Sequence, residues 1–407
     1  MAIISISKLL LIVGGLFILV FTHSSRPNYA ETQQKLPYFV TPYAVLSALL
    51  VFSISLLWTS AGNQEALGAL AKYGKLLIIP LLILLIHTRH EAVFAVTVFV
   101  ASQAFLLASS WFLYWGVPLW WATSIMSKTH YAVFSSYLDQ GIMAAVLASV
   151  CWHFKHLVQK KHGYSVMVFV AVVATLNALF VLVGRSGHAV AIVLLSVAIM
   201  WELPKKIRPL VLLLPFVIAF LLFFVSGAVQ QRMTLVVAEV QNHSYDAPTT
   251  TSTGTRLNLW EAALTIMSQH PLKGSGVGSW TPEYNILKSA RNSAHVPIAS
   301  NGNPHQEYLM WGVQLGYVGI FLLLAFFAAI WSDSRKLPKP YCRAAQSVLL
   351  ALVVACFFNA TLYDAYIGDF FCVTLGLLMA LGRCSILESA VDNNNQPEFR
   401  IATTHAL

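Results

Sequence analysis

Residues 306–331 read QEYLMWGVQLGYVGIFLLLAFFAAIW, an almost uncharged run long enough to cross a bilayer as a helix. About eleven such runs recur through the 407 residues, so that 57% of the chain is hydrophobic and only 10% is charged. Soluble globular chains carry about 25% charged residues. The sequence therefore predicts an all-α polytopic membrane protein with about 11–12 transmembrane helices, and it excludes a soluble enzyme with a single anchor.

The predicted spans lie near residues 6–22, 38–58, 67–86, 92–115, 131–154, 163–183, 188–201, 209–226, 306–331, 344–362 and 367–381. A twelfth span exists if the first is a pair or a re-entrant segment. No small-residue cleavage pattern follows the first span before His23, so we interpret it as a retained helix rather than a signal peptide. The expected organisation is N-terminal helices (1–226), a loop (227–304), C-terminal helices (305–383) and a tail (384–407).

The net charge of +9 reflects topology rather than a nucleic-acid partner, because the basic residues are scattered between the apolar runs. Loops on one side hold fifteen Lys and Arg residues, whereas the opposite short loops hold only Lys128 and Arg185. The positive-inside rule makes the first side cytoplasmic and places the loop 227–304 outside. The five cysteines have no metal-ligand spacing and imply no disulfide framework.

The outside loop contains a predicted amphipathic helix over residues 256–270, which Pro271 ends. Its apolar face is expected to hold Leu257, Trp260, Leu264 and Met267. Arg256 begins this helix, where an anion could reach both the guanidinium and helix N–H groups. The alternative is a surface packing helix whose arginine is merely solvated.

Gly274-Ser-Gly-Val-Gly278 follows that helix. No strand precedes this segment and neither GK[ST] nor GxGxxG is completed, so it is not a nucleotide-binding fingerprint. We expect a tight turn, with a backbone nest for an anion as a minor alternative.

Asn303-Pro-His-Gln306 precedes the quoted span and has the pattern of a capping box, with His305 expected at the second helical position. The positive end of the helix would keep His305 neutral and able to accept a proton. An interfacial histidine without chemistry is the alternative.

Polar residues also interrupt other helix junctions. Gly184-Arg-Ser-Gly-His188 joins two spans on the outside, where Arg185 needs an anionic partner, a water-filled cavity or a lipid head group. His188 could share the face of Arg185 or act as a cap. Lys72 and Lys75 lie within a span and are functional candidates unless they snorkel. Asp364 and Asp369 flank the last outer turn, and two carboxylates make a weak cation site, so a polar turn is favoured.

Four of these segments together resemble the motif series of the O-antigen ligase and polymerase superfamily. The segments are GRSGH (184–188), GTRLNLW (254–260), HPLKGSGVG (270–278) and PHQEYL (304–309), and they occur in the family's order. Each is weak alone, whereas the ordered set is fairly specific. Gln306 is a departure, since many relatives have Asn after the histidine, although an amide is retained.

The resemblance implies a GT-C-like multi-helix glycosyltransferase of the inner membrane, with a periplasmic active site. Such an enzyme takes a glycan from undecaprenyl diphosphate and passes it to an acceptor hydroxyl, which for a ligase belongs to lipid A-core. His305 would be catalytic, and Arg185 and Arg256 would bind the donor diphosphate. Gln306, His188 and Tyr308 are candidate supporting residues.

The chemistry of these residue types agrees with that implication. A diphosphate leaving group needs charge stabilisation, which two arginines provide, and the acceptor proton needs a neutral base, which a histidine provides. Attack opposite the diphosphate would invert the anomeric centre. The sequence has no DxD motif or histidine cluster, so we expect metal independence and no cofactor.

Two further functions stay open at the sequence level. An O-antigen or exopolysaccharide polymerase, or a protein O-oligosaccharyltransferase, would share the chemistry, although the short tail leaves no room for the extra C-terminal domain that resembles the protein-glycosylating branch. A secondary transporter is disfavoured because the distinctive polar residues gather on one face, whereas alternating access needs both faces.

Overall fold

The computed structural model describes residues 38–395, with gaps at 159, 183, 226, 228–229, 231–233, 236, 239–251 and 291–301. Among these residues every regular element is helical, which confirms the all-α class. Seven helices are long and apolar enough to cross a membrane, namely Asn63–Leu85, Arg89–Tyr114, Lys161–Val181, Arg185–Glu202, Glu307–Ser334, Lys339–Phe358 and Ala365–Ser389. Thr41–Leu57 is a shorter apolar helix. The chain is a multi-pass helical membrane protein.

The helices follow in chain order as α3 (Thr41–Ile54), α4 (Asn63–Tyr73), α5 (Ile78–Leu85), α6 (Arg89–Tyr114), α7 (Ile125–His130), α8 (Tyr137–Phe154), α9 (Lys161–Leu176), α10 (Arg185–Glu202), α11 (Leu214–Val225), α13 (Ser252–Gln269), α14 (Trp280–Ala290), α15 (Glu307–Ser334), α16 (Lys339–Phe358) and α17 (Ala365–Asn395). Short 3-10 helices η1 (Ser55–Leu57), η2 (Gly74–Leu77) and η4 (Arg208–Leu213) and a π-helix, η3 (Asn177–Val181), adjoin them. Every predicted span after the first falls on these helices. The predicted span at 6–22 lies outside the described residues.

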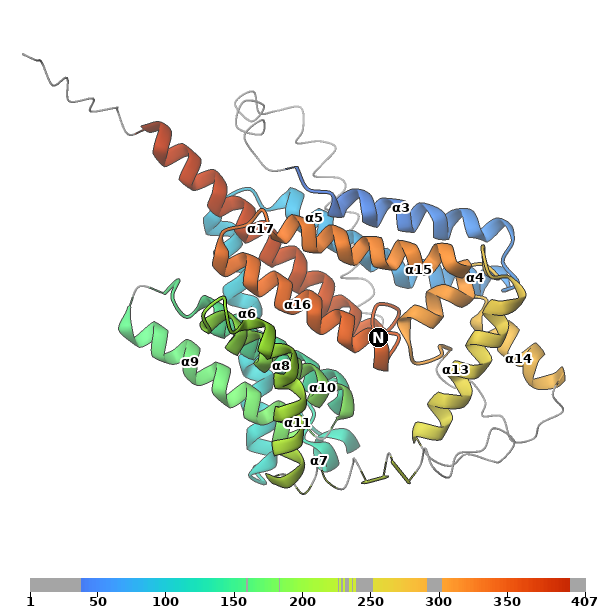
Figure 1. The fold of residues 1–407 in the computed structure, drawn as a ribbon, viewed down its shortest axis with the longest axis horizontal. Coiled ribbons are helices and arrows are strands. Elements are labelled where there is room, and N and C mark those ends of the chain that lie inside the picture. Colours follow the sequence, from blue (N-terminus) through green and yellow to red (C-terminus); the bar gives the residue numbers. More distant parts are fainter. Residues whose placement is uncertain are drawn as a thin grey trace, which may run out of the picture.

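Helix α8 is central to one part of the bundle, where it contacts α9, α10 and α16. Residues 140–151 of α8 are buried without interruption, because neighbours surround it. Helix α15 lies beside α3 and α16, and α17 lies beside α5 and α6. The two loop helices, α13 and α14, gather at one end of the bundle, at the right of Figure 1, where both contact α15.

The predicted loop helix exists as α13 and ends before Pro271, and its predicted apolar face is right in part, because Met267 is buried and Trp260 packs against the core. Leu264 is 52% exposed, whereas Leu259, Ala262, Ala263 and Ile266 are buried. The small alanines allow α13 to pack closely on α15. The buried face of α13 therefore contains Met267 from the predicted set together with residues outside that set.

The glycine-rich segment 274–278 packs between α15 and the segment that runs from η1 to α4. Gly274, Gly276 and Gly278 all have positive φ, a region that suits glycine. Opposite this segment α15 is interrupted at Gly316 (φ 63°, ψ −150°). Across that break the N–H groups of Tyr317 and Val318 donate hydrogen bonds to the carbonyls of residues 271 and 272, at 2.7 and 3.4 Å. Irregular backbone inside a membrane helix is tolerated where other protein groups satisfy it in this way.

Every N–H group from 274 to 278 is bonded to another part of the protein. Their acceptors are the carbonyls of His270, Val313 and Gln314, the Ser55 hydroxyl and the Gln314 side-chain oxygen, at 2.8–3.0 Å. The minor alternative of a backbone anion nest is therefore wrong, because no N–H group of the segment is left for an anion. The segment is a turn, as expected, and it fixes the loop to the bundle.

Substitution of Gly276 by alanine should destabilise the protein by about 2–5 kcal/mol, as left-handed strain adds to overpacking. A Cβ at Gly276 would collide with the backbone of Thr59. The matched control is Gly68→Ala on α4, where a Cβ meets nothing within 4 Å. Thermal unfolding in detergent should show a lower midpoint for Gly276→Ala only. Equal midpoints would contradict the close packing of Gly276 against Thr59.

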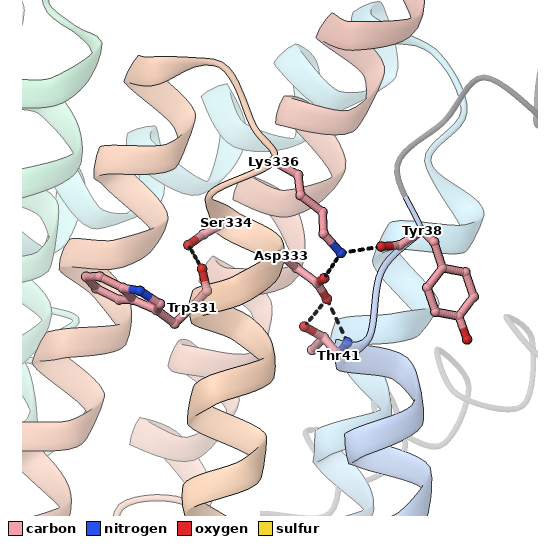
Figure 2. Close-up of polar contacts among 6 residues, drawn as sticks. All are labelled: Tyr38, Thr41, Trp331, Asp333, Ser334 and Lys336. Atoms are coloured by element: carbon pink, nitrogen blue, oxygen red, sulfur yellow. Dashed lines mark hydrogen bonds and ion pairs between the residues drawn. The ribbon is translucent and has the colours of Figure 1, made fainter.

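A buried carboxylate ties α3 to α15 at the far end of α15 (Figure 2). Asp333 accepts hydrogen bonds from the Thr41 N–H and hydroxyl, each at 2.7 Å, and its other oxygen accepts from Lys336 at 2.7 Å. Lys336 also donates to the Tyr38 carbonyl. The carboxylate thus caps the positive end of α3 and is paired, which offsets the cost of its complete burial.

Candidate active site

His305 lies before α15 rather than inside it. Its φ is +54°, and α15 begins at Glu307 with Gln306 as N-cap and no capping hydrogen bond from the Gln306 side chain. The predicted capping box with His305 at the second helical position is therefore wrong. The reason is tertiary: Asn303 donates to Asp364 at 3.2 Å, and Glu307 accepts from the N–H groups of Leu362 (2.7 Å) and Tyr363 (3.2 Å).

The turn that carries His305 is nevertheless well defined. The His305 N–H donates to the Asn303 side-chain oxygen at 2.8 Å, which closes a tight turn. The same Asn303 holds Asp364, from the loop between α16 and α17. The loop 302–306 and the loop 359–364 are therefore joined by side-chain hydrogen bonds on both sides of the histidine.

The imidazole itself is oriented by that second loop. His305 Nδ1 lies 3.1 Å from Asn359 Oδ1, and Asn359 Nδ2 donates to Asp364 Oδ2 at 2.7 Å. Because a carboxylate only accepts, the amide nitrogen must face Asp364 and the amide oxygen must face the histidine. Nδ1 then carries the proton in the neutral ring. This arrangement leaves the lone pair of Nε2 to accept a proton.

Burial lowers the pKa of His305 below its usual value, and the positive charge of Arg256 lowers it further, while the bond to Asn359 opposes both. A neutral imidazole at neutral pH was expected from the sequence. The cause differs from the one expected, since burial is the largest influence and His305 is not in the first helical turn.

Two lysines within a membrane span support the loop that orients His305. Lys75 is buried and donates to the carbonyls of Asp364 (2.6 Å) and Tyr363 (3.4 Å). Lys72 lies 4.0 Å from the centroid of the Tyr363 ring. Burial raises the pKa of Asp364, and Lys75, Asn359 and Lys72 oppose that rise. Lys75 therefore points into the protein rather than to the lipid head groups, whereas Lys72 is exposed.

Asn359 and Asp364 were not singled out as site residues from the sequence. Asp364 was assigned to a polar turn, and Asn359 immediately follows a span. A signal for both exists in hindsight, because a short polar loop ends near a span that contains two lysines. Asp369 lies four residues into α17, and among described residues no group of three or more His, Cys, Asp or Glu side chains is placed to hold a metal ion.

The two predicted arginines come together with His305 at one end of the bundle. Arg185 begins α10, and its guanidinium donates to the Thr253 hydroxyl at 2.6 Å, in the first turn of α13. Arg256 lies one turn further along α13 and is close enough to act electrostatically on both Arg185 and His305. Burial and the nearby Arg185 lower the pKa of Arg256. Two like charges in a partly buried position favour an anion between them.

His188, Tyr308 and Gln306 have structural positions instead. Both ring nitrogens of His188 face backbone carbonyls, those of Gly184 (2.7 Å) and Leu179 (2.9 Å), so the ring fastens η3 to the start of α10. The Tyr308 hydroxyl donates to the carbonyl of Val353 on α16 at 3.1 Å. Gln306 contributes the helix N-cap. Among the described residues, none of the three forms a hydrogen bond with His305, Asn359 or Asp364.

Residues 169–324 match the family model described as O-antigen ligase. This segment belongs to the O-antigen ligase family. It contains Arg185, Arg256 and His305, whereas Asn359 and Asp364 lie beyond the matched residues. No curated protein matches the chain significantly. The match of this segment supports an enzyme of the ligase or polymerase type that acts on lipid-linked glycans in a membrane.

Proposed function

We propose that this protein is an O-antigen ligase, which transfers a glycan from undecaprenyl diphosphate to a sugar hydroxyl of lipid A-core. The observation that carries the proposal is the His305 network. It presents a neutral imidazole whose Nε2 carries the lone pair, within electrostatic range of Arg256, which in turn lies within range of Arg185, so that the two cations suit a diphosphate. Under this proposal the enzyme lies in the inner membrane, and its active site faces the periplasm.

The proposed reaction needs one group that accepts a proton and one cationic group that stabilises the leaving diphosphate. His305 Nε2 takes the proton from the acceptor hydroxyl while that oxygen bonds to the anomeric carbon of the donor glycan. The bond from this carbon to the diphosphate breaks, and the electron pair leaves with undecaprenyl diphosphate. Arg185 and Arg256 stabilise the charge that grows on the leaving group. Attack from the opposite face inverts the anomeric centre.

The orientation supports that proposal. Arg185 and His305 lie at the ends of α10 and α15 away from Glu202 and Ser334, and the basic residues Lys155 and Lys336 lie at those other ends. Under the positive-inside rule, the end that holds Lys155 and Lys336 is cytoplasmic. A site on the opposite side has no access to nucleotide sugars, so its donor must arrive already activated on a lipid.

Reconstitution of the purified protein with undecaprenyl-diphosphate glycan and lipid A-core, in the presence of a chelator, tests the function. A ligase should move the glycan to lipid A-core, as measured by the mass of the product, with the α-to-β or β-to-α change determined by NMR. Transfer only to a second lipid-linked repeat would make the protein a polymerase. Transfer to a protein would make it a protein O-oligosaccharyltransferase.

The pH dependence of transfer should show an acidic limb below the ordinary histidine value of about 6.5, since protonated His305 cannot accept a proton. Arg256→Gln removes a charge that lowers this pKa, so its limb should move to higher pH. Asn359→Ala removes a bond that raises the pKa, so its limb should move to lower pH, with a rate roughly 10- to 100-fold lower from loss of orientation. Shifts in the same direction for both variants would contradict the assignment.

A further inference from the structure

A second candidate binding site lies along α10, away from His305. An apolar cavity of about 170 Å³ separates α8, α9 and α10. Its wall is mostly small or aliphatic and includes Ala148, Ala191 and Ala198, while Val172 and Leu176 form a partly exposed rim on α9. Apolar cavities of about 150 Å³ in proteins stay dry and accept hydrocarbon. The cavity therefore suits part of an alkyl chain.

One end of this cavity leads to a group of cations. Trp152 lines the cavity, and Lys155 follows it by three residues at the end of the same helix. The Lys155 ammonium lies 3.2 Å from the centroid of the Trp152 ring and forms an ion pair with Glu202 at 2.7 Å. Three residues beyond Ala198 lies Trp201. Three residues of an α-helix span about 4.5 Å, so the cationic group adjoins the cavity.

Trp201 is the centre of that group. The guanidinium carbons of Arg208 and Arg343 lie 5.2 Å and 4.9 Å from the Trp201 ring centroid. Lys155 and Arg343 both act electrostatically on Glu202, the carboxylate that the described residues bring to these cations. Arg208 instead donates from its Nε to the Leu203 carbonyl at 3.2 Å.

The group and the cavity wall also contain more buried hydrogen-bond donors than acceptors for them. The indole N–H of Trp201 is buried and has no acceptor among the described residues. The Trp152 indole N–H and the Ser149 hydroxyl, both in the cavity wall, have none either. A buried donor without a partner costs free energy, and an indole and a guanidinium can only donate. Glu202 pairs with Lys155, so among the described residues neither Arg208 nor Arg343 has a carboxylate in ion-pair distance and the Trp201 N–H has no acceptor.

We propose that an anionic phospholipid occupies this site, with its phosphate at Arg208, Arg343 and the Trp201 N–H and one acyl chain in the cavity. Basic pockets between transmembrane helices bind the head groups of anionic lipids in this way. The proposal is independent of the glycan-transfer reaction, because the site lies at the other end of α10 from Arg185.

The competing occupant is the polyprenyl chain of the lipid-linked donor, whose diphosphate would lie at Arg185. Ala191, the lining residue of α10 nearest to Arg185, is six residues away, or about 9 Å along the helix. The cationic group is half as far from the cavity, and it supplies the charge that a phosphate needs. These two facts favour the phospholipid.

Native mass spectrometry of the full-length protein, titrated with phosphatidylglycerol or with zwitterionic phosphatidylcholine, tests the proposal. Wild type should retain phosphatidylglycerol with at least about tenfold preference. Each basic side chain contributes roughly fivefold to anionic-lipid binding, so Arg208→Gln with Arg343→Gln should weaken it by about 30-fold. Lys205→Gln with Lys206→Gln is the matched control, because both lysines are exposed and the same charge is removed.

Several results would overturn the assignment: equal losses in the two double variants, no loss in the arginine variant, or no preference for phosphatidylglycerol. Ala198→Leu should also weaken binding, since it fills the cavity. Displacement of phosphatidylglycerol by undecaprenyl phosphate would show that the polyprenyl chain of the glycan donor, rather than an acyl chain, occupies the cavity. Should the double arginine variant not fold, Arg208→Gln alone decides, with an expected loss of about fivefold.

Discussion

Replacement of His305 by alanine should lower the rate of glycan transfer by about 100- to 10,000-fold, the usual contribution of a positioned general base. The imidazole is the group whose Nε2 lone pair can take the acceptor proton, and Asn359 and Asp364 orient it through hydrogen bonds. Affinity for the lipid-linked donor should change little, because the diphosphate is assigned to the arginines. The measurement is the initial rate of transfer in liposomes, with donor binding determined separately.

The matched control for this prediction is Tyr308→Phe, three residues along the chain. Tyr308 donates to the Val353 carbonyl, and its ring packs at 4.6 Å from that of Phe357, so removal of its hydroxyl should leave transfer within a few-fold of wild type. His305→Gln keeps a hydrogen-bonding side chain but cannot act as a base near pH 7. Transfer that survives in both His305 variants would remove histidine from the mechanism and with it the observation that carries the proposed function.

The helical architecture could be predicted from sequence because hydropathy reports the membrane directly. Every predicted span that falls within the described residues coincides with a helix, since a helix satisfies the backbone hydrogen bonds of a long apolar run within the run itself. Packing detail did not follow as well. The buried face of α13 contains Ala262 and Ala263, whose small side chains matter through close approach to α15, and a pattern of large apolar residues does not register them.

The candidate site was only partly visible in the sequence. His305, Arg185 and Arg256 stand in local motifs, whereas Asn359 and Asp364 join His305 through contacts that span more than fifty residues of chain. The capping-box prediction failed for the same reason. Asn303 and His305 have hydrogen-bond partners in the loop 359–364, so tertiary hydrogen bonds displaced a strong local pattern.

Substitution of Arg256 by alanine should reduce transfer by roughly 100- to 1,000-fold, the range seen when one group that stabilises transition-state charge is removed. Arg185→Ala should act in the same direction. Both guanidiniums lie where their charges interact, so they repel each other until an anion is bound. Binding of the diphosphate relieves that repulsion. Donor affinity should therefore fall in each variant, and the loss in the double variant should differ from the sum of the single losses, because the two groups act on one anion.

The control for the arginines is Lys273→Ala, which removes a positive charge from the same loop at an exposed position, 6.0 Å from the Trp58 ring and outside the described site. Its donor affinity should match that of wild type, which separates a local clamp from general attraction of an anionic lipid. Raised ionic strength should weaken binding in all variants only slightly, since partly buried charges are screened less than exposed ones. If both arginine variants bound undecaprenyl-diphosphate glycan as tightly as wild type, the diphosphate would have to be held elsewhere.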